Sequence, residues 1–292
     1  MGNFERREGY RMKHTIVRKE ALSAENYLIE VVAPLVVRKY KPGQFVIIRI
    51  HEEGERIPLT VADVNPEKET VILVFQVVGK TTKELGTLHV GDAVLDCVGP
   101  LGNPSKIMKF GRVVCVGGGT GIACIYPLTR ALADAGNEVI SIIGARTESL
   151  LILENEITKV STETYIMTDD GSKGHRGLVT DMLEELMNKY EDSGGIDRVI
   201  TIGPPVMMKA VAELTRPRGI KTIASLNTIV IDGSGMCGSC RVFVEGEMKL
   251  VCVSGPEFDA HKVNFDDVMS RLTMFKEKEV QAMAYYDSKD TH

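Results

Sequence analysis

Three cysteines in the last part of the chain have a spacing suited to a metal centre. Two residues separate Cys237 from Cys240, and Cys252 follows after eleven more. The plant-type [2Fe–2S] pattern is Cys, four residues, Cys, two residues, Cys and a distant fourth Cys. Cys237, Cys240 and Cys252 match its last three positions, and Asp232 occupies the first. Because a carboxylate keeps the negative charge of a thiolate, we predict a [2Fe–2S] cluster held by these four side chains.

Two other interpretations of this stretch stay open. A structural zinc site uses the same types of ligand, although zinc motifs usually combine two closely spaced ligand pairs. Alternatively, the thiols carry no metal and Asp232 is only a turn residue before Gly-Ser-Gly. If Asp232 is not a ligand, the candidates for the fourth position are His261, Ser234 and Ser239.

The composition limits the class of protein. The chain has 292 residues, of which 43% are hydrophobic and 26% are charged, enough for two or more globular cores. A net charge of −5 without a long Lys/Arg run argues against nucleic acid or an anionic membrane as a partner. There is no apolar leader and no run of eighteen apolar residues. With Cys97, Cys115 and Cys124 in apolar contexts, we expect reduced thiols and a cytoplasmic protein.

Residues 12–108 are predicted to form an antiparallel β-barrel. Short β-branched runs at Tyr27–Val32, Phe45–Ile50 and Thr70–Val78 alternate with turn residues. Strands of this length and spacing are typical of a barrel.

Two loops of this barrel carry groups that can bind phosphate. One spans residues 56–60, where the cation of Arg56 lies near the hydroxyl of Thr60. The other is the turn at residues 79–82, which we expect to precede a helix over Lys83–Leu88. Glycine and hydroxyl donors at the start of a helix suit an anion. A simple helix cap is the alternative.

Residues 109–226 are predicted to form a doubly wound α/β domain with a parallel sheet. The apolar strand Arg112–Val116 leads into the glycine turn Gly117–Gly121 and a helix over Ile122–Ala135. The alternation continues with strands at Glu138–Ile143, Tyr165–Thr168 and Arg198–Ile202 and helices at Ser149–Ile157, Gly177–Tyr190 and Pro204–Arg216. This pattern predicts a ligand at the carboxyl ends of the strands. Because Ile122 replaces the third glycine of the dinucleotide fingerprint, the turn alone indicates either a phosphate site or a plain tight turn.

The remaining residues are expected to form an appendage over 227–262, which holds the cysteines, and a helical tail over 263–292. Apolar residues recur at helical spacing after a capping Asn264: Phe265, Val268, Met269, Leu272 and Phe275. They predict an amphipathic helix of about three turns or more. Such a stripe either packs on its own domain or clamps a partner chain.

Taken in order, these segments resemble the ferredoxin–NADP reductase superfamily. The motifs that carry the resemblance are Lys-Pro-Gly-Gln-Phe at 41–45, Arg-Ile-Pro-Leu-Thr at 56–60, Gly-Lys-Thr-Thr at 79–82, Gly-Pro-Leu-Gly at 99–102 and Gly-Gly-Gly-Thr-Gly-Ile at 117–122. The resemblance covers nearly the whole chain. It implies an FAD-binding barrel, a nicotinamide-nucleotide domain and an iron–sulfur appendage.

The resemblance also implies which residues contact the cofactors. Flavin contacts fall on Arg56, Pro58, Leu59, Thr60, Val74, Phe75, Gln76, Gly79, Thr81 and Thr82. Nicotinamide-nucleotide contacts fall on Gly118, Gly119, Thr120, Gly121, Arg146, Asp170 and Gly203. In the glycine turn, the backbone amides and the Thr120 hydroxyl would hold the pyrophosphate. Arg146 can stack on adenine or pair with a 2′-phosphate, or it is only a surface arginine. NAD(H) is preferred over NADP(H) on the resemblance alone.

Within the superfamily, the chain is most similar to the small subunits of NADH-dependent reduced ferredoxin:NADP oxidoreductase, the electron-bifurcating transhydrogenase also described as a sulfide dehydrogenase. The resemblance implies electron transfer between NAD(H), FAD and a [2Fe–2S] cluster, because hydride carries two electrons and the cluster accepts one. It also implies a larger partner subunit with another FAD, [4Fe–4S] clusters and an NADP site, through which ferredoxin reacts.

Three alternatives stay open at this stage. An electron-transfer subunit of dihydroorotate dehydrogenase would pair with a barrel-shaped FMN subunit. A stand-alone oxygenase or a sulfide or polysulfide reductase would turn over its substrate without a partner. A metal or nucleotide sensor without enzymatic activity would use the same architecture.

Overall fold

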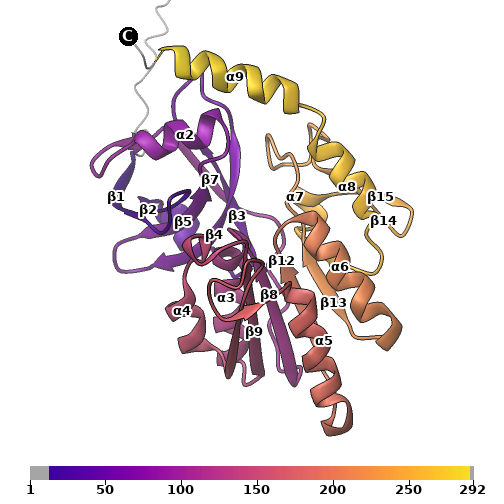
Figure 1. Cartoon of the computed structure of the whole chain (residues 1–292). Coiled ribbons are helices and arrows are strands. Elements are labelled where there is room, and N and C mark those ends of the chain that lie inside the picture. The colour runs from indigo at the N-terminus through magenta and orange to yellow at the C-terminus, as the bar shows by residue number, and fades with distance from the viewer. Residues whose placement is uncertain (1–12, 290–292) are drawn as a thin grey trace, which may run out of the picture.

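Alternating apolar residues in the first third of the chain form an antiparallel sheet that curls into a barrel (Figure 1). The computed structural model describes residues 13–289, so residue 12, where this barrel was expected to begin, lies outside the described residues. The strands pair in the order β6-β1-β2-β5-β4-β3-β7. They are β1 (His14–Ala21), β2 (Asn26–Val32), β3 (Phe45–Arg49), β4 (Ile57–Asn65), β5 (Thr70–Gln76), β6 (Ala93–Val94) and β7 (Asp96–Leu101). Because Leu95 alone separates the two edge strands, the sheet nearly closes.

The inside of the barrel is filled with side chains. Every second residue along its strands points inward, and the fully buried set includes Ile16, Ile29, Val46, Ile48, Val61, Val71, Leu73 and Phe75. Two short helices cover its ends, α1 (Pro34–Val37) and α2 (Lys80–Thr87). The barrel is thus a rigid wall and not a pore.

The second sheet is largely parallel and follows the order β11-β10-β9-β8-β12-β13-β16. Its strands are β8 (Arg112–Gly118), β9 (Glu138–Ala145), β10 (Glu163–Thr168), β11 (His175–Arg176), β12 (Arg198–Ile202), β13 (Thr222–Ser225) and β16 (Glu257–Asp259). The order reverses at β8, the first strand of the domain. In doubly wound sheets the ligand binds at this switch point, outside the carboxyl ends of the strands.

Helices cover both faces of this sheet. On one face lie α3 (Gly121–Asp134) and α4 (Glu154–Val160), and on the other α5 (Val179–Tyr190) and α6 (Pro205–Thr215). Alternate residues of β8 enter the two cores, since Val113 and Cys115 face α3 whereas Val114 and Val116 face α5. The predicted fold class, an antiparallel barrel followed by a doubly wound α/β domain, is confirmed.

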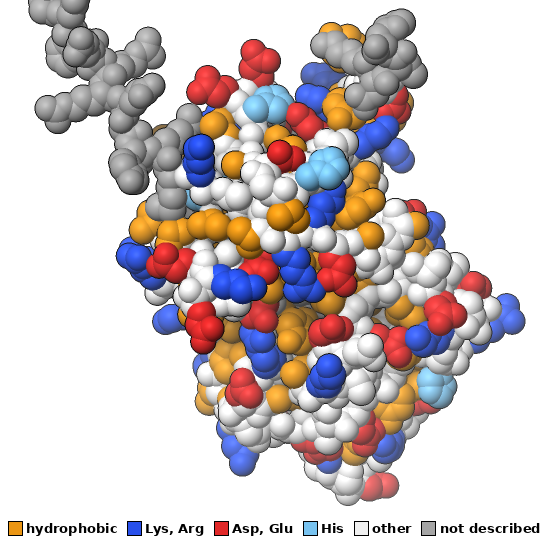
Figure 2. Space-filling model, turned by 90° about the vertical axis from the view of Figure 1, so that its left-hand side faces the viewer, with side chains coloured by type: hydrophobic (Ala, Val, Ile, Leu, Met, Phe, Trp, Pro, Cys, Tyr) orange, Lys and Arg blue, Asp and Glu red, His pale blue; other side chains and the backbone are white. Residues whose placement is uncertain are grey.

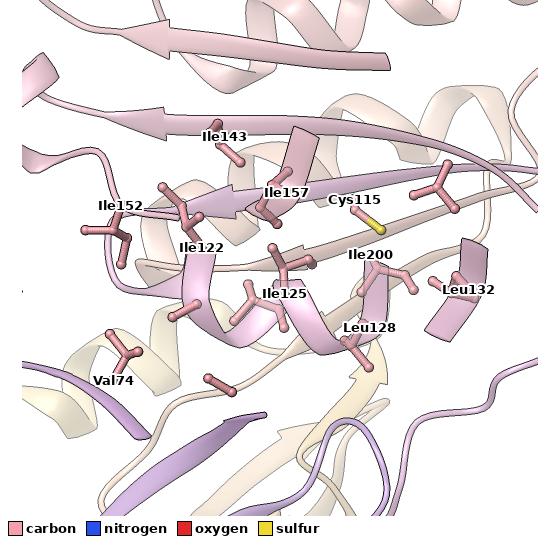
Figure 3. Packing of buried hydrophobic residues seen from close by; sticks show 14 of the residues in the cluster. Val74, Cys115, Ile122, Ile125, Leu128, Leu132, Ile143, Ile152, Ile157 and Ile200 are labelled. Carbon is pink, nitrogen blue, oxygen red and sulfur yellow. The ribbon is translucent and has the colours of Figure 1, made fainter. Parts of the chain in front are cut away.

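One core joins the barrel to the second sheet. Ile122, Ile125, Leu128 and Leu132 lie along α3 and face the sheet, as Figure 3 shows. The same cluster includes Leu28, Ala62 and Val74 of the barrel. The two parts therefore share apolar packing, which fixes α3 and the glycine turn before it against the barrel wall.

The appendage is a small hairpin packed on the side of the second sheet. Its strands β14 (Arg241–Val244) and β15 (Glu247–Leu250) are joined by Glu245 and Gly246, both at positive φ as in a tight hairpin turn. Helix α7 (Val251–Ser254) follows, and β16 then pairs antiparallel with β13. The appendage thus contributes an edge strand to the nucleotide sheet, which the sequence pattern did not predict.

The tail consists of two helices, and the first is shorter than the amphipathic helix of three turns or more that was expected. Helix α8 (Phe265–Leu272) begins at Asn264, whose side chain accepts a hydrogen bond from the Asp267 N–H at 3.0 Å. Phe265 and Val268 are buried in the core of the appendage, so this part packs on its own domain. Helix α9 (Lys276–Lys289) then crosses to the barrel and contacts α2 (Figure 1).

The surface carries charges of both signs. On the face in Figure 2, Lys and Arg side chains are interspersed with Asp and Glu. None of the helices between residues 13 and 289 is long and apolar enough to cross a membrane.

Candidate functional site

A large cavity opens between the barrel wall and the carboxyl ends of the parallel strands. Its volume is about 810 Å³, within the range typical of sites for small molecules and cofactors. One wall comes from β4 and β5 of the barrel. The opposite wall comes from the turns after β8, β9, β10 and β12. The cavity therefore lies at the switch point that the topology indicates.

Most residues predicted to contact the cofactors line this one cavity. They are Pro58, Leu59, Thr60, Val74, Phe75, Gln76 and Thr82 from the barrel, and Gly118, Gly119, Thr120, Gly121, Arg146 and Gly203 from the second sheet. Two sets chosen from segments far apart in the sequence thus face each other across the same space.

Four of the predicted contacts do not line the cavity. Arg56 is exposed beyond its rim. Thr81 is buried, and its hydroxyl donates a hydrogen bond to the Glu55 carboxylate at 2.5 Å. Gly79 precedes α2, and Asp170 accepts hydrogen bonds from the backbone and the hydroxyl of Ser172 in its own turn. The neighbouring Asp169 lines the cavity instead of Asp170.

The turn at residues 79–82 is a helix cap as well as part of the cavity edge. Helix α2 begins at Lys80, three residues earlier than expected, so Thr82 lies in its first turn. The Thr82 hydroxyl accepts hydrogen bonds from the N–H groups of Val78 and Gly79, each at 3.1 Å. The simple reading of the Gly-Lys-Thr-Thr stretch as a cap therefore holds, while Thr82 still reaches the cavity.

The glycines after β8 permit a close approach of backbone and ligand. Gly119 has a φ of +55°, and a Cβ added there would meet no atom within 4 Å, so it would project into open space. At Gly121 an added Cβ would lie 2.3 Å from the Ile202 carbonyl oxygen. Gly119 therefore leaves room for a ligand, whereas Gly121 is required by packing between α3 and the end of β12.

The cavity carries few charges. Among the described residues that line it, Arg146 and Asp169 are the charged ones, and both are exposed at the ends of β9 and β10. Helix α3 directs its amino terminus at the space between them and the barrel, and a helix amino terminus attracts phosphate. Phosphate binding in this cavity would rest mainly on backbone dipoles.

Asn26 and Cys124 are two of the lining residues that were not among the predicted contacts. Asn26, at the start of β2, is 2% exposed and lines it beside Gln76. Cys124 of α3 also lines it; burial raises the pKa of its thiol, and a hydrogen bond with Thr60 opposes that shift. A single polar residue at a strand start and a cysteine in an apolar helix give no signal in the sequence, because their partners lie on distant segments.

The cysteine stretch is shaped by the hairpin that follows it. Arg241 pairs with Leu250 across β14 and β15, so Cys240 and Cys252 meet at the open end of the hairpin. Their sulfurs are 3.3 Å apart, and both thiols are buried. Two sulfurs on one tetrahedral metal with bonds of about 2.3 Å stand about 3.8 Å apart. A small increase in the distance between the two sulfurs would let the pair bind one iron.

The other half of the candidate ligand set is more exposed. The Asp232 carboxylate accepts hydrogen bonds from the backbone N–H of Ser234 at 2.5 Å and of Cys237 at 2.8 Å. Contacts with Ser234, followed by Cys237, lower the pKa of Asp232 to about 2. Within residues 13–289, no three candidate side chains converge on a single ion. The carboxylate is thus ionised and fixed next to Cys237, as both the turn and the ligand interpretation require.

The thiol of Cys252 is protonated when no metal is bound. Burial, followed by the contact with Cys240, raises the pKa of Cys252. Metal binding at this pair must therefore displace the proton of Cys252. The donor set nevertheless fits an iron–sulfur cluster, because two thiols are already in contact and an anionic oxygen lies beside the third.

The alternative fourth ligands differ in position. His261 is bound elsewhere, since its Nε2 lies 2.9 Å from the Thr215 hydroxyl of α6. Ser239 lies 3.1 Å from the Cys237 sulfur and Ser234 contacts Asp232. The serines remain in the cluster loop, whereas His261 faces the second sheet.

Comparisons with known proteins identify two parts of the chain. The family model described as the iron–sulfur cluster binding domain of dihydroorotate dehydrogenase B matches residues 227–264. The model of the oxidoreductase NAD-binding domain matches residues 115–213. A Thermotoga maritima homolog of the electron transfer subunit of dihydroorotate dehydrogenase B (NAD(+)) is 45% identical over 264 residues, covering 90% of this chain and 92% of its own length. The chain belongs to this family of electron transfer subunits.

One further relative and one solved structure are similar to this protein along most of the chain. The electron transfer subunit from Geobacillus thermodenitrificans is 34% identical over 262 residues, or 87% of this chain and 98% of its own. A chain of the NADH-dependent reduced ferredoxin-NADP oxidoreductase structure, described for flavin-based electron bifurcation, has 43% identity and a TM-score of 0.87. That match covers 95% of this chain and 99% of the other. The predicted resemblance and the iron–sulfur prediction are confirmed at the level of the family, while the individual contacts stay predictions.

Proposed function

We propose that this chain is the electron-transfer subunit of a heteromeric, electron-bifurcating NADH-dependent ferredoxin:NADP oxidoreductase. The observation that carries the proposal is the combination of a nucleotide-sized cavity and a cysteine loop in the same chain. The nicotinamide supplies two electrons as hydride, the flavin exchanges one or two, and the cluster exchanges one. The match to the bifurcating enzyme over 95% of the chain supports the choice of reaction.

The barrel side of the cavity is assigned to FAD. Pro58, Leu59 and Thr60 of β4 and Val74, Phe75 and Gln76 of β5 present a mostly apolar wall with a hydroxyl and an amide. Such a wall suits a flat ring with polar edges. Thr82 lines this side of the cavity at the start of α2, where its hydroxyl donates to the Gly79 carbonyl and so shapes the turn beside the diphosphate. Arg56 and Thr81 do not line the cavity, so their contacts with FAD stay predictions.

The opposite side of the cavity is assigned to NAD(H). The turn at residues 118–121 and Gly203 allow the diphosphate to approach the amino terminus of α3. Arg146 and Asp169 lie where the adenosine half would extend. Since the one lining arginine is accompanied by an aspartate, this end of the cavity offers little net positive charge for an extra phosphate, which favours NAD(H).

The cluster loop is assigned to a [2Fe–2S] group held by Asp232, Cys237, Cys240 and Cys252. The contact between Cys240 and Cys252 supports one iron on this pair, which leaves Asp232 and Cys237 for the other. We divide the chain accordingly into a barrel over residues 12–108, a nucleotide domain over 109–226, a cluster appendage over 227–262 and a tail over 263–292.

The partner is proposed to be a larger flavo-iron–sulfur subunit with FAD, [4Fe–4S] clusters and an NADP site, through which ferredoxin reacts. The relatives described as electron transfer subunits support a second subunit. The described cysteines are free thiols, in keeping with a reducing compartment such as the cytoplasm.

A dihydroorotate dehydrogenase complex is the second candidate, because the curated relatives carry that name. The residue that favours bifurcation is Asp232 in place of the first cysteine. Both complexes use the same three groups in this subunit. The distinction therefore lies in the partner and its substrates.

The test is anaerobic purification of the native complex, followed by assays with defined donors. We expect this chain to show the absorption spectra of a flavin and an iron–sulfur cluster. We also expect the complex to reduce NADP⁺ when NADH and reduced ferredoxin are both supplied as electron donors. Dihydroorotate-dependent reduction of NAD⁺ and an FMN partner would establish the second candidate instead. A colourless chain that binds no flavin would contradict both.

A further inference from the structure

Of the polar contacts that join the barrel to the nucleotide domain near the cavity, two differ in their position relative to it. The first is a hydrogen bond of 2.9 Å from the Thr120 hydroxyl to Oδ1 of Asn26. The second is a bidentate ion pair between Arg130 of α3 and Asp63 of β4, with distances of 2.6 and 2.8 Å. Thr120 and Asn26 line the cavity, whereas Arg130 and Asp63 do not. Of these two contacts, the first thus lies inside the site and the second outside it.

The acceptor of the first contact is fixed by the barrel itself. Nδ2 of Asn26 donates to the Ser23 hydroxyl at 2.9 Å, and the Asn26 N–H donates to the same oxygen at 3.1 Å. Gln76, the cross-strand partner of Asn26, is held in turn by Glu25 through a hydrogen bond of 2.7 Å. With Asn26 2% exposed, its amide has no freedom to swing into the cavity.

The Thr120 hydroxyl carries one hydrogen, and it is already donated. Phosphate oxygens at neutral pH accept hydrogen bonds, and a hydroxyl that donates to an amide oxygen has nothing left to donate to them. A pyrophosphate at this turn would therefore have to take its hydrogen bonds from the backbone. The role that the family resemblance implied for this side chain conflicts with its contact.

We propose that Thr120 is a positioning residue and not a phosphate ligand. Its bond to Asn26 fixes the glycine turn relative to the barrel wall, and so sets the distance and angle at which the nicotinamide meets the flavin. The inference rests on the proposed function. In the step concerned, NADH loses a hydride and becomes NAD⁺, and the flavin gains that hydride with a proton from solvent. Because proximity and orientation govern such a transfer, its rate responds to this contact more than the affinity does.

The test uses Thr120→Val and Asn26→Ala in the holoprotein, singly and together. Calorimetry with NAD⁺, which binds without reacting, measures affinity, and anaerobic stopped-flow with saturating NADH measures the limiting rate of flavin reduction. We expect an NAD⁺ affinity within twofold of wild type and a limiting rate about tenfold lower, or about 1.4 kcal/mol in the barrier. The double variant should be no slower than the slower single variant, since both remove the same bond. Thr120→Ser should restore the rate.

Asp63→Asn is the matched control, because it weakens the second contact outside the cavity. Its limiting rate should stay within twofold of wild type. A tenfold loss of NAD⁺ affinity in Thr120→Val with an unchanged rate would show that the hydroxyl binds phosphate. Losses that multiply in the double variant, or an equal loss in Asp63→Asn, would also overturn the inference. If NADH fails to reduce the wild-type flavin, the proposed function is wrong and this inference falls with it.

Discussion

Gly119 and Gly121 lie two residues apart in the same turn, yet the structure gives them opposite roles. An alanine methyl at Gly121 would be 2.3 Å from the oxygen and 2.7 Å from the carbon of the Ile202 carbonyl. These are backbone atoms at the end of β12, so the clash cannot be relieved by a side-chain rotation. A methyl at Gly119 would meet nothing within 4 Å. One substitution should damage the fold, and the other should damage the site.

The magnitudes follow from these contacts. Gly121→Ala must move α3 or the β12 turn by about 1 Å, and overpacking of this kind costs about 3 kcal/mol. For a chain of this size that corresponds to a fall in melting temperature of about 6–12 °C. Gly119→Ala should lower the free energy of unfolding by only about 1 kcal/mol, the cost of an L-residue at positive φ. Its methyl, however, occupies the space through which the nucleotide diphosphate would approach the turn.

The assay combines thermal melting of both variants with calorimetric titration of NAD⁺. Gly119→Ala should melt within about 4 °C of wild type and lose most of its NAD⁺ affinity and its flavin reduction by NADH, while the cluster spectrum is retained. Gly119→Val should abolish reduction as well, but a β-branched residue at positive φ adds strain, so alanine is the cleaner variant. Full NAD⁺ affinity in Gly119→Ala, or a melting temperature of Gly121→Ala equal to wild type, would refute the reasoning.

Three further predictions concern the other parts of the chain. Asp232→Ala should lose much of its iron whereas Asp232→Cys should keep a [2Fe–2S] cluster with a shifted potential; full iron and an unchanged paramagnetic resonance signal in Asp232→Ala would place the ligand elsewhere. Thr60→Val should lower flavin occupancy or shift the flavin spectrum, and it is a better test than Thr82→Val, which also removes the cap of α2. Burial lowers the pKa of His261 in the folded state, so its contribution to stability is present above the unfolded value of about 6.5 and is lost as the pH falls through the folded value. The fall in urea midpoint between pH 8 and pH 5 should therefore be smaller in His261→Gln than in wild type.

The order of elements was predictable because it depends on local periodicity. Arg112–Gly118 is a continuous apolar run buried on both faces, and the helix that follows carries its apolar residues on the side that meets the sheet. The boundaries of α2 were missed because Thr82 bonds backward to Val78 and Gly79, which draws Lys80 into the helix. In the tail, the apolar stripe that starts at Phe265 continues past Leu272 in the sequence. The first helix nevertheless ends at Leu272, and α9 runs toward α2.

The cysteine spacing predicted the cluster loop, but not how the loop is assembled. Cys240 and Cys252 meet because a hairpin turn at Glu245 and Gly246 folds the intervening strands together. The spacing motif records only the number of residues in that hairpin. Likewise, the edge strand β16 joins the nucleotide sheet through pairing with β13, a contact that leaves no periodic signal in so short a segment.

The sequence did not predict the hydrogen bond between Thr120 and Asn26, which joins the two domains. Thr120 was assigned to the nucleotide by the family resemblance, and its hydroxyl donates a hydrogen bond to Asn26, which lies 94 positions away in the chain. Nothing near Asn26 in the sequence marks it as a hydrogen-bond acceptor, because an asparagine at this position looks like an ordinary turn residue before a strand. Long-range hydrogen bonds at the seam between two folded units are set by how those units dock, and their docking is decided by the shared apolar core around α3. Motifs therefore identify the groups that meet a ligand as a set, and the packing between domains decides which of them are available to bind it.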